Sequence, residues 1–137
     1  MAYWLFKSEP GSWSWTDQIA AGAKGQEWDG VRNPQAQGHM KAMRKGDLGF
    51  FYHTGDVKAV IGIVEVIGEA HPESKDPAWQ CVDLAAREEL PRPVTLAAVK
   101  ADPQLKDMVL AKAPRLSVQP VTAAEWSRIR IMGGLAG

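Results

Sequence analysis

The chain has 137 residues, of which 45% are hydrophobic and 23% charged, and its 16 basic and 16 acidic side chains give a formal net charge of zero. This length fits one domain, and the composition is that of a folded globular protein rather than a disordered one. A protein that coats nucleic acid through its phosphates carries a large positive charge, so any phosphate contact here must be local.

The first residues and the single cysteine limit the class of protein further. Residues 1–7 hold a short apolar run with no basic leader and no cleavage site, so we expect neither a signal peptide nor a membrane span, and a cytoplasmic protein. Cys81 alone cannot form an internal disulfide or a zinc site, and its place in an alternating apolar run predicts an inert core thiol. We expect a monomer with no membrane partner, no metal and no cofactor.

Strand-favouring residues and turn signals predict six short strands. The first run, from Tyr3, is rich in aromatic residues and stops at Pro10, which cannot donate to a sheet. The run from Ala59 is apolar on both faces, which indicates a strand in the middle of a sheet, and its Gly62 and Gly68 are candidate bulges. The predicted strands cover residues 3–8, 26–31, 47–53, 59–70, 79–85 and 115–119.

Capping residues predict the helices between these strands. Ser14 and Thr122 each stand three residues before an acidic residue, which is the spacing of a capping box, and Asn33 precedes a proline that the first turn tolerates. Helices are predicted after each of these three residues, and two further short ones at residues 95–101 and 105–110. Six strands with peripheral short helices in so small a chain predict an α+β fold built on a partly closed β-barrel.

Tryptophan is abundant and unevenly placed, since four of the six tryptophans fall within the first 28 residues. Core packing explains Trp4, Trp79 and Trp126, which lie in strand or helix patterns. Trp28 differs because it lies in a loop dense in polar groups, residues 27–33. An indole beside hydrogen-bonding groups suits a flat ligand with a π face, so this loop predicts a binding pocket.

The residue pattern indicates neither a hydrolytic enzyme nor a metal enzyme. His39, His53 and His71 show no metal-ligand spacing, and the sequence contains no nucleophile elbow and no P-loop. Glu9 and Asp29 could act as an acid/base pair only if the fold brought them together. The alternative for Glu9 is a structural role, in which its carboxylate fixes the loop through backbone hydrogen bonds.

Four strings of residues, in this order and together spanning almost the whole chain, resemble the EVE domain. They are Tyr3–Pro10, Trp28–Asn33, Met43–Asp47 running into Phe51–His53, and Arg115–Pro120. Thr54, where members often have serine, and Phe50, where they are often aliphatic, are mild departures. The resemblance implies a pseudouridine-synthase-and-archaeosine-transglycosylase-like (PUA-like) barrel related to the YTH readers of N6-methyladenosine. It also implies recognition of a modified base, such as methylated or hydroxymethylated cytosine.

The resemblance further implies which residues surround the base. One side of the pocket would be lined by Lys7, Ser8, Glu9 and Pro10, with Trp28 as the stacking wall and Val31, Arg32 and Asn33 in contact with the edge of the base. Tyr52 and His53 would lie at the rim, and Arg115 and Ser117 would complete the polar side. The stretch from Arg32 to Lys45 contains no acidic residue, and its Lys41, Arg44 and Lys45 are predicted to hold flanking phosphates, with a solvated helix face as the alternative.

The predicted function is therefore non-catalytic binding of nucleic acid, DNA or RNA, that carries a modified base. Two alternatives stay open. One is a PUA-like RNA-binding domain without preference for a modification. The other is a nuclease-like or base-processing enzyme, in which Lys7, Glu9, Arg32 and Tyr52 would bind phosphate and transfer protons.

Overall fold

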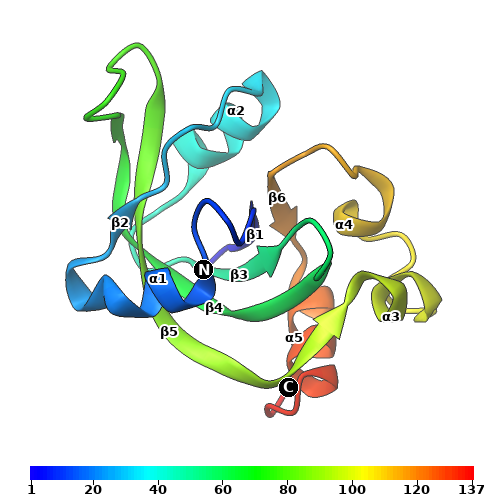
Figure 1. Cartoon of the computed structure of the whole chain (residues 1–137). Helices are drawn as coiled ribbons and strands as arrows, with labels where there is room; N and C mark the ends of the chain where they lie inside the picture. Colours follow the sequence, from blue (N-terminus) through cyan, green and yellow to red (C-terminus); the bar gives the residue numbers. More distant parts are fainter.

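The computed structural model describes residues 1–137 and contains one six-stranded sheet with helices on both faces (Figure 1). The strand order is β2-β5-β4-β3-β1-β6, in which β1 and β3 are parallel and all other neighbours antiparallel. The strands are β1 (Tyr3–Ser8), β2 (Gln26–Glu27), β3 (Leu48–His53), β4 (Ala59–Pro72), β5 (Gln80–Thr95) and β6 (Val118–Val121). The expected α+β class and the six strands are confirmed. The edge strands β2 and β6 do not pair with each other, so the barrel is not closed.

The sheet is strongly bent because its two longest strands, β4 and β5, pair with repeated shifts of register (Figure 1). Gly62 and Gly68 both lie at such shifts, which confirms the predicted bulges. At Gly62 a β-carbon would lie 2.5 Å from the ring of Trp15. The missing side chain therefore lets the indole lie directly against the strand.

The two faces of the sheet are covered by separate apolar cores, because side chains alternate along each strand. The α2-side core lies under α1 (Trp15–Ala20) and α2 (Pro34–Ala42), and the α5-side core under α3 (Leu96–Ala101), α4 (Val109–Lys112) and α5 (Ala123–Met132). The α2-side core consists of Trp4, Phe6, Trp15, Trp28, Val31, Ala36, Met40, Met43, Phe51, Val64, Val66, Val82, Leu84, Leu116 and Val118. The α5-side core consists of Leu5, Phe50, Tyr52, Val60, Ile63, Leu90, Val94, Val99, Leu105, Met108, Leu110, Val121, Trp126 and Ile129.

The helices begin where the capping residues predict. Ser14 before α1 and Thr122 before α5 both form complete capping boxes, and the side chain of Asn33 accepts a hydrogen bond from the first turn of α2. A 3-10 turn, η1 (Gly22–Lys24), links α1 to β2. The predicted helix at residues 105–110 is wrong, because α4 spans only Val109–Lys112. None of the helices is both long enough and apolar enough to cross a membrane.

Three strands differ from their predicted bounds by more than two residues at one end. The strand predicted at residues 79–85 continues to Thr95 across Pro91 and Pro93, where β5 pairs with β4 but no longer with β2, and an edge tolerates proline. The strand predicted at residues 26–31 ends at Glu27, shortly before Gly30 turns the chain with φ of 81°. The last strand begins only at Val118, so Arg115 and Ser117 precede it.

Candidate functional site

A cavity of about 600 Å³ lies between the end of β1, the loop that follows it, and the segment after β2. Its volume falls within the range of small-ligand sites. It is lined by Lys7, Ser8, Glu9, Ser12, Trp13, Gln26, Glu27, Trp28, Asp29, Gly30, Val31, Arg32, Lys75 and Ser117. Trp13, Trp28 and Val31 are the apolar members of this set, and the rest offer hydrogen-bond donors and acceptors of both charges. The cavity thus combines aromatic surface with a polar lining, which a flat polar ligand requires.

The two indoles of the cavity are held in different ways. Trp28 is only 7% exposed and packs edge-on against Phe6 and Phe51, with ring centroids 5.6 and 5.7 Å apart, so it is both a core residue and part of the wall. Trp13 is half-buried, and its Nε1 donates to Oε1 of the fully buried Gln18 at 2.9 Å. Both rings are therefore fixed before any ligand arrives.

The end of β1 supplies the polar side of the cavity. The Lys7 ammonium donates to the carbonyl of Pro114 at 3.0 Å and lies 5.8 Å from the centre of the Tyr52 ring, and burial lowers its pKa. The Ser8 hydroxyl donates to the carbonyl of Trp13, which closes the loop between them. Glu9 is exposed and accepts a hydrogen bond from the Thr54 hydroxyl at 3.3 Å. The loop is instead held by the backbone carbonyl of Glu9, which accepts from the N–H groups of Ser12 and Trp13, so the predicted backbone hydrogen bonds of its carboxylate are absent.

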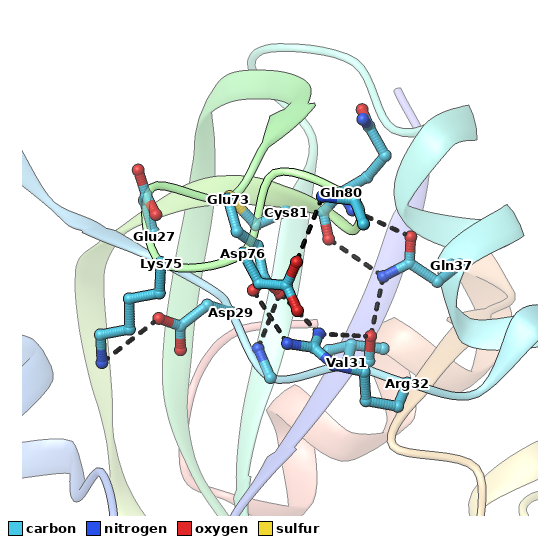
Figure 2. Close-up of polar contacts among 12 residues, drawn as sticks. Glu27, Asp29, Val31, Arg32, Gln37, Glu73, Lys75, Asp76, Gln80 and Cys81 are labelled. Atoms are coloured by element: carbon cyan, nitrogen blue, oxygen red, sulfur yellow. Dashed lines mark hydrogen bonds and ion pairs between the residues drawn. The ribbon is translucent and has the colours of Figure 1, made fainter.

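The opposite side, residues 28–32, is pinned by two buried polar side chains (Figure 2). Glu73, from the turn between β4 and β5, accepts from the backbone N–H of Gly30 at 2.9 Å. Gln37 of α2 donates to the carbonyl of Val31 at 2.8 Å and to that of Gln80 at 3.0 Å. Because Glu73 comes from a distant turn and Gln37, six residues beyond Val31, also binds the start of β5, this wall is preorganised by the tertiary fold.

Arg32 is engaged inside this wall. Its guanidinium binds Glu73 through two hydrogen bonds of 2.8 and 3.1 Å (Figure 2). It also lies 4.8 Å from the centre of the Trp79 ring. The Arg32 partner lowers the pKa of Glu73, and Glu73 raises that of Arg32. Trp79 is only partly buried and stacks on Arg32, so its prediction as a core residue is wrong, whereas Trp4 and Trp126 are buried as predicted.

The structure brings most of the predicted site residues together but not all of them. Lys7, Ser8, Glu9, Trp28, Val31, Arg32 and Ser117 line the cavity. The lining does not include five other predicted residues, namely Pro10, Asn33, Tyr52, His53 and Arg115. Asn33 caps α2 through Ala36, and Tyr52 lies in the α5-side core, where burial raises its pKa. The His53 Nε2 accepts from the backbone N–H of Trp15 at 3.1 Å, and burial lowers the pKa of His53.

The three basic residues predicted to hold phosphates lie near the far end of α2. Arg44 and Lys45 line a separate hollow beside the first two residues and Asp47, and neither they nor Lys41 line the cavity. The cations that do line it are Lys7, Arg32 and Lys75. A phosphate role for Lys41, Arg44 and Lys45 stays a prediction.

Sequence reasoning missed several residues of the cavity. Trp13 could have been found, because it belongs to the same amino-terminal cluster of tryptophans as Trp28. Lys75, whose ammonium lies 3.6 Å from the Asp29 carboxylate, and the anchors Glu73 and Gln37 carried no local signal.

Beside the cavity, four potential metal ligands converge. The donor atoms of Glu27, His71, Cys81 and Asp83 all lie within 4.8 Å of one another. Cys81 is fully buried, and burial together with the surrounding carboxylates raises the pKa of its thiol to about 12. The expectation of no metal-ligand arrangement considered only spacing along the chain, and these residues meet across three strands.

Comparison with known proteins identifies relatives of this chain. The model of the EVE domain matches residues 2–132. Human thymocyte nuclear protein 1 is 33% identical in an alignment 159 residues long, gaps included. The alignment covers 91% of this chain and 71% of that protein. A crystal structure of a protein from Agrobacterium tumefaciens superposes with a TM-score of 0.97 at 51% identity and covers 100% of this chain and 96% of the other.

Two further structures contain nucleic acid. The crystal structure of human THYN1 in complex with 5-methylcytosine-containing DNA has a TM-score of 0.89 at 28% identity, with 100% of both chains covered. The YTH domain of Zygosaccharomyces rouxii MRB1, in complex with N6-methyladenosine RNA, has a TM-score of 0.61 at 11% identity, covering 99% of this chain and 88% of that one. At that identity the second likeness shows a shared fold alone.

Proposed function

The chain belongs to the EVE domain family, and from this premise we propose that it binds nucleic acid and holds one modified base in the cavity between the end of β1 and residues 28–32. The observation that carries the proposal is a cavity with two indoles and a polar lining, in a chain that shares its fold with human THYN1. That protein is seen in complex with DNA that contains 5-methylcytosine.

The energetics of such binding are feasible. Removing a base from its stack costs a few kcal/mol, and stacking on an aromatic side chain returns about 1 to 3 kcal/mol per contact. Trp13 offers the more accessible ring, and Trp28 supplies a rigid wall. Hydrogen bonds from Ser12 or Ser117 and to Asp29 could then read the edge of the base.

Charge around the cavity is local and balanced, which suits a single flipped base rather than a long backbone contact. Lys7 and Lys75 are positioned to meet a flanking phosphate, whereas Arg32 is held by Glu73 and acts by positioning the wall. Glu9, Glu27 and Asp29 contribute negative charge to the same cavity. We therefore expect modest affinity for unmodified strands.

The experiment compares short oligonucleotides that differ only in one base. Fluorescence anisotropy would measure the affinity for DNA and RNA strands with cytosine, 5-methylcytosine or 5-hydroxymethylcytosine at one position. The wild-type chain should prefer one modified strand by about 1 to 3 kcal/mol, which is a factor of about 5 to 150. Equal affinity for all strands of one backbone would instead favour an RNA- or DNA-binding domain without preference for a modification.

A tryptophan variant tests the location of the base. Trp13→Ala removes a half-buried ring from the cavity and should abolish the preference, while Tyr3→Ala, an aromatic residue stacked on Trp126 in the other core, should retain it. Trp13→Ala leaves Gln18 Oε1 without its donor, so circular dichroism must show that the variant folds. Trp28→Ala is less informative because Trp28 is also part of the core.

The proposal includes the absence of catalysis. His53 is engaged by the backbone of Trp15, and Glu9 is exposed to solvent without an oriented basic partner. Prolonged incubation with modified and unmodified strands, with and without magnesium or manganese, should leave them intact by mass spectrometry. Product formation that is lost in Glu9→Gln would show a nuclease-like or base-processing enzyme instead.

A further inference from the structure

We propose that Glu27, His71, Cys81 and Asp83 form a binding site for a divalent transition-metal ion of the zinc type, which ties β2 to the hairpin of β4 and β5. The site goes beyond the proposed base binding and does not depend on it. The four side chains offer one sulfur, one imidazole nitrogen and two carboxylate oxygens within 4.8 Å of one another. Borderline ions such as Zn²⁺ accept such a mixed set, whereas Mg²⁺ and Ca²⁺ take oxygen ligands.

The register of three strands places these side chains on one face. His71 of β4 lies opposite Cys81 of β5, and Asp83 follows two residues later on the same face of β5. Glu27 of β2 lies opposite Asp83 on the other side of β5. The convergence is therefore a property of the sheet rather than of flexible loops.

One donor–donor distance matches a tetrahedral ion, and the imidazole orientation would have to change to bind it. With a Zn–S bond of about 2.3 Å and a Zn–N bond of about 2.0 to 2.1 Å, tetrahedral geometry separates the two donor atoms by about 3.6 Å. The Cys81 Sγ lies 3.7 Å from the His71 Nε2 but also 3.9 Å from its Nδ1, so the imidazole would have to turn before Nε2 pointed at an ion shared with the sulfur. Both Asp83 carboxylate oxygens lie 3.0 Å from the same nitrogen, so this carboxylate would have to move away from the imidazole to admit an ion between them.

The tautomer of His71 presents the correct nitrogen. Its Nδ1 lies 2.9 Å from the carbonyl oxygen of Pro72, and because a carbonyl only accepts, Nδ1 carries the proton. Metal-binding histidines commonly donate their second ring N–H to a backbone carbonyl in this way. The Nε2 then faces the Asp83 carboxylate.

Room and charge at the site also favour a cation. At Gly68 a β-carbon would lie 2.2 Å from the Asp83 carboxylate, so glycine leaves the space into which that carboxylate fits. The carboxylates of Asp29 and Glu73 add negative potential at the buried thiol, although Lys24 and Lys75 line the adjoining hollow. Binding of the ion would release the Cys81 thiol proton to solvent as the sulfur–metal bond forms.

The ion would stiffen one wall of the base-binding cavity. Glu27 lines that cavity and immediately precedes Trp28, so fixing its carboxylate to the β4 and β5 hairpin limits movement of the indole. Both oxygens of the Glu27 carboxylate accept hydrogen bonds from Ser74, one from its backbone N–H at 3.0 Å and one from its hydroxyl, so the ion would have to replace or share one of them.

The test uses the untagged chain, stripped with a chelator and dialysed against Zn²⁺ or Co²⁺, with bound metal measured by elemental analysis. We expect one ion per chain, a rise in melting temperature, and, with Co²⁺, a thiolate-to-cobalt charge-transfer band in the near ultraviolet. Cys81→Ser should lose that band, and His71→Gln, a partly exposed position, should weaken binding at least about tenfold. Asp76→Asn, an exposed acidic residue in the hairpin turn, is the matched control and should bind as the wild type does.

Several results would overturn the proposal. Binding that does not saturate at one ion per chain, or that is equal for Mg²⁺, would show general attraction to acidic residues. Unchanged binding in His71→Gln and Cys81→Ser, both folded by circular dichroism, would show that the ion lies elsewhere. No binding by the folded wild-type chain would leave His71 and Asp83 as a plain ion pair.

Discussion

The two cores of the sheet are nearly equal in size, with 15 and 14 buried residues, but they differ in what surrounds them. The α2-side core contains three of the six tryptophans, adjoins the buried side chains of Gln37 and Glu73, and opens into the cavity. The α5-side core contributes Tyr52 and Trp126 as its polar-tipped aromatics and otherwise packs apolar side chains under three helices. One face of the sheet therefore carries a core closed under three helices, and the other carries a core of similar size that opens into the candidate cavity.

The largest expected effect is on stability and comes from a substitution of Phe50 in the α5-side core. This ring is fully buried and stacks on Trp126, with centroids 4.0 Å apart. Phe50→Ala should lower the free energy of unfolding by about 3 to 5 kcal/mol in urea titrations. The affinity of the folded fraction for a modified oligonucleotide should not change. If affinity falls along with stability, the two faces are not independent.

A smaller effect on stability, with a larger effect on binding, is expected from Glu73 beside the α2-side core. Glu73→Gln keeps the shape but removes the charge that holds the Arg32 guanidinium and the N–H of Gly30. The free energy of unfolding should fall by about 1 to 3 kcal/mol. Because residues 28–32 lose their anchor, oligonucleotide affinity should fall as well. The exposed Glu88→Gln serves as a control, and retained affinity in Glu73→Gln would show that the wall is held by Gln37 alone.

The smallest effect is a pH dependence that belongs to the α2-side core. His39 contacts Trp4, and His53 contacts Phe51; burial lowers the pKa of both histidines. Below about pH 6.5 these two histidines bind protons in the unfolded chain but not in the native chain, so their contribution to the free energy of unfolding should decrease as the pH is lowered, by at most about 1.4 kcal/mol per pH unit for each. His71 acts in the opposite direction, because its hydrogen bond to Asp83 raises its pKa. His53→Gln keeps an acceptor for Trp15 and should flatten the profile in urea titrations at stepped pH. An identical profile would assign the effect to other groups.

Local signals in the sequence were sufficient for much of the fold. The caps at Ser14, Asn33 and Thr122, and the bulges at Gly62 and Gly68, depend on side chains a few residues apart, and all five are confirmed. The length of β5 was missed because proline usually ends a strand. A proline ends a strand only where a neighbouring strand would accept a hydrogen bond from the backbone N–H that proline lacks. Whether such a neighbour exists at Pro91 and Pro93 follows from the order of strands in the sheet.

The candidate site was less accessible to sequence reasoning. Short sequence motifs were enough to predict that the end of β1 and Trp28 belong to the site. The contacts of Glu73 with Arg32 and of Gln37 with Gln80 join residues 41 and 43 positions apart, so no local motif predicts them. His71 and Cys81 likewise meet only because of the register of a hairpin with irregular pairing. Tyr52 and His53, expected at the rim, are not in the cavity lining, because Tyr52 packs in the α5-side core and the His53 ring accepts from the N–H of Trp15; their contact with a ligand stays a prediction.

The most direct test of the base-binding cavity uses the six indole N–H signals of the chain in a two-dimensional ¹⁵N nuclear magnetic resonance spectrum. An oligonucleotide with the preferred modified base should shift the signals of Trp13 and Trp28 and leave that of Trp126, in the α5-side core, unchanged. The unmodified strand should cause smaller shifts at the same two signals. Shifts confined to tryptophans outside the cavity, or equal shifts with both strands, would contradict the account.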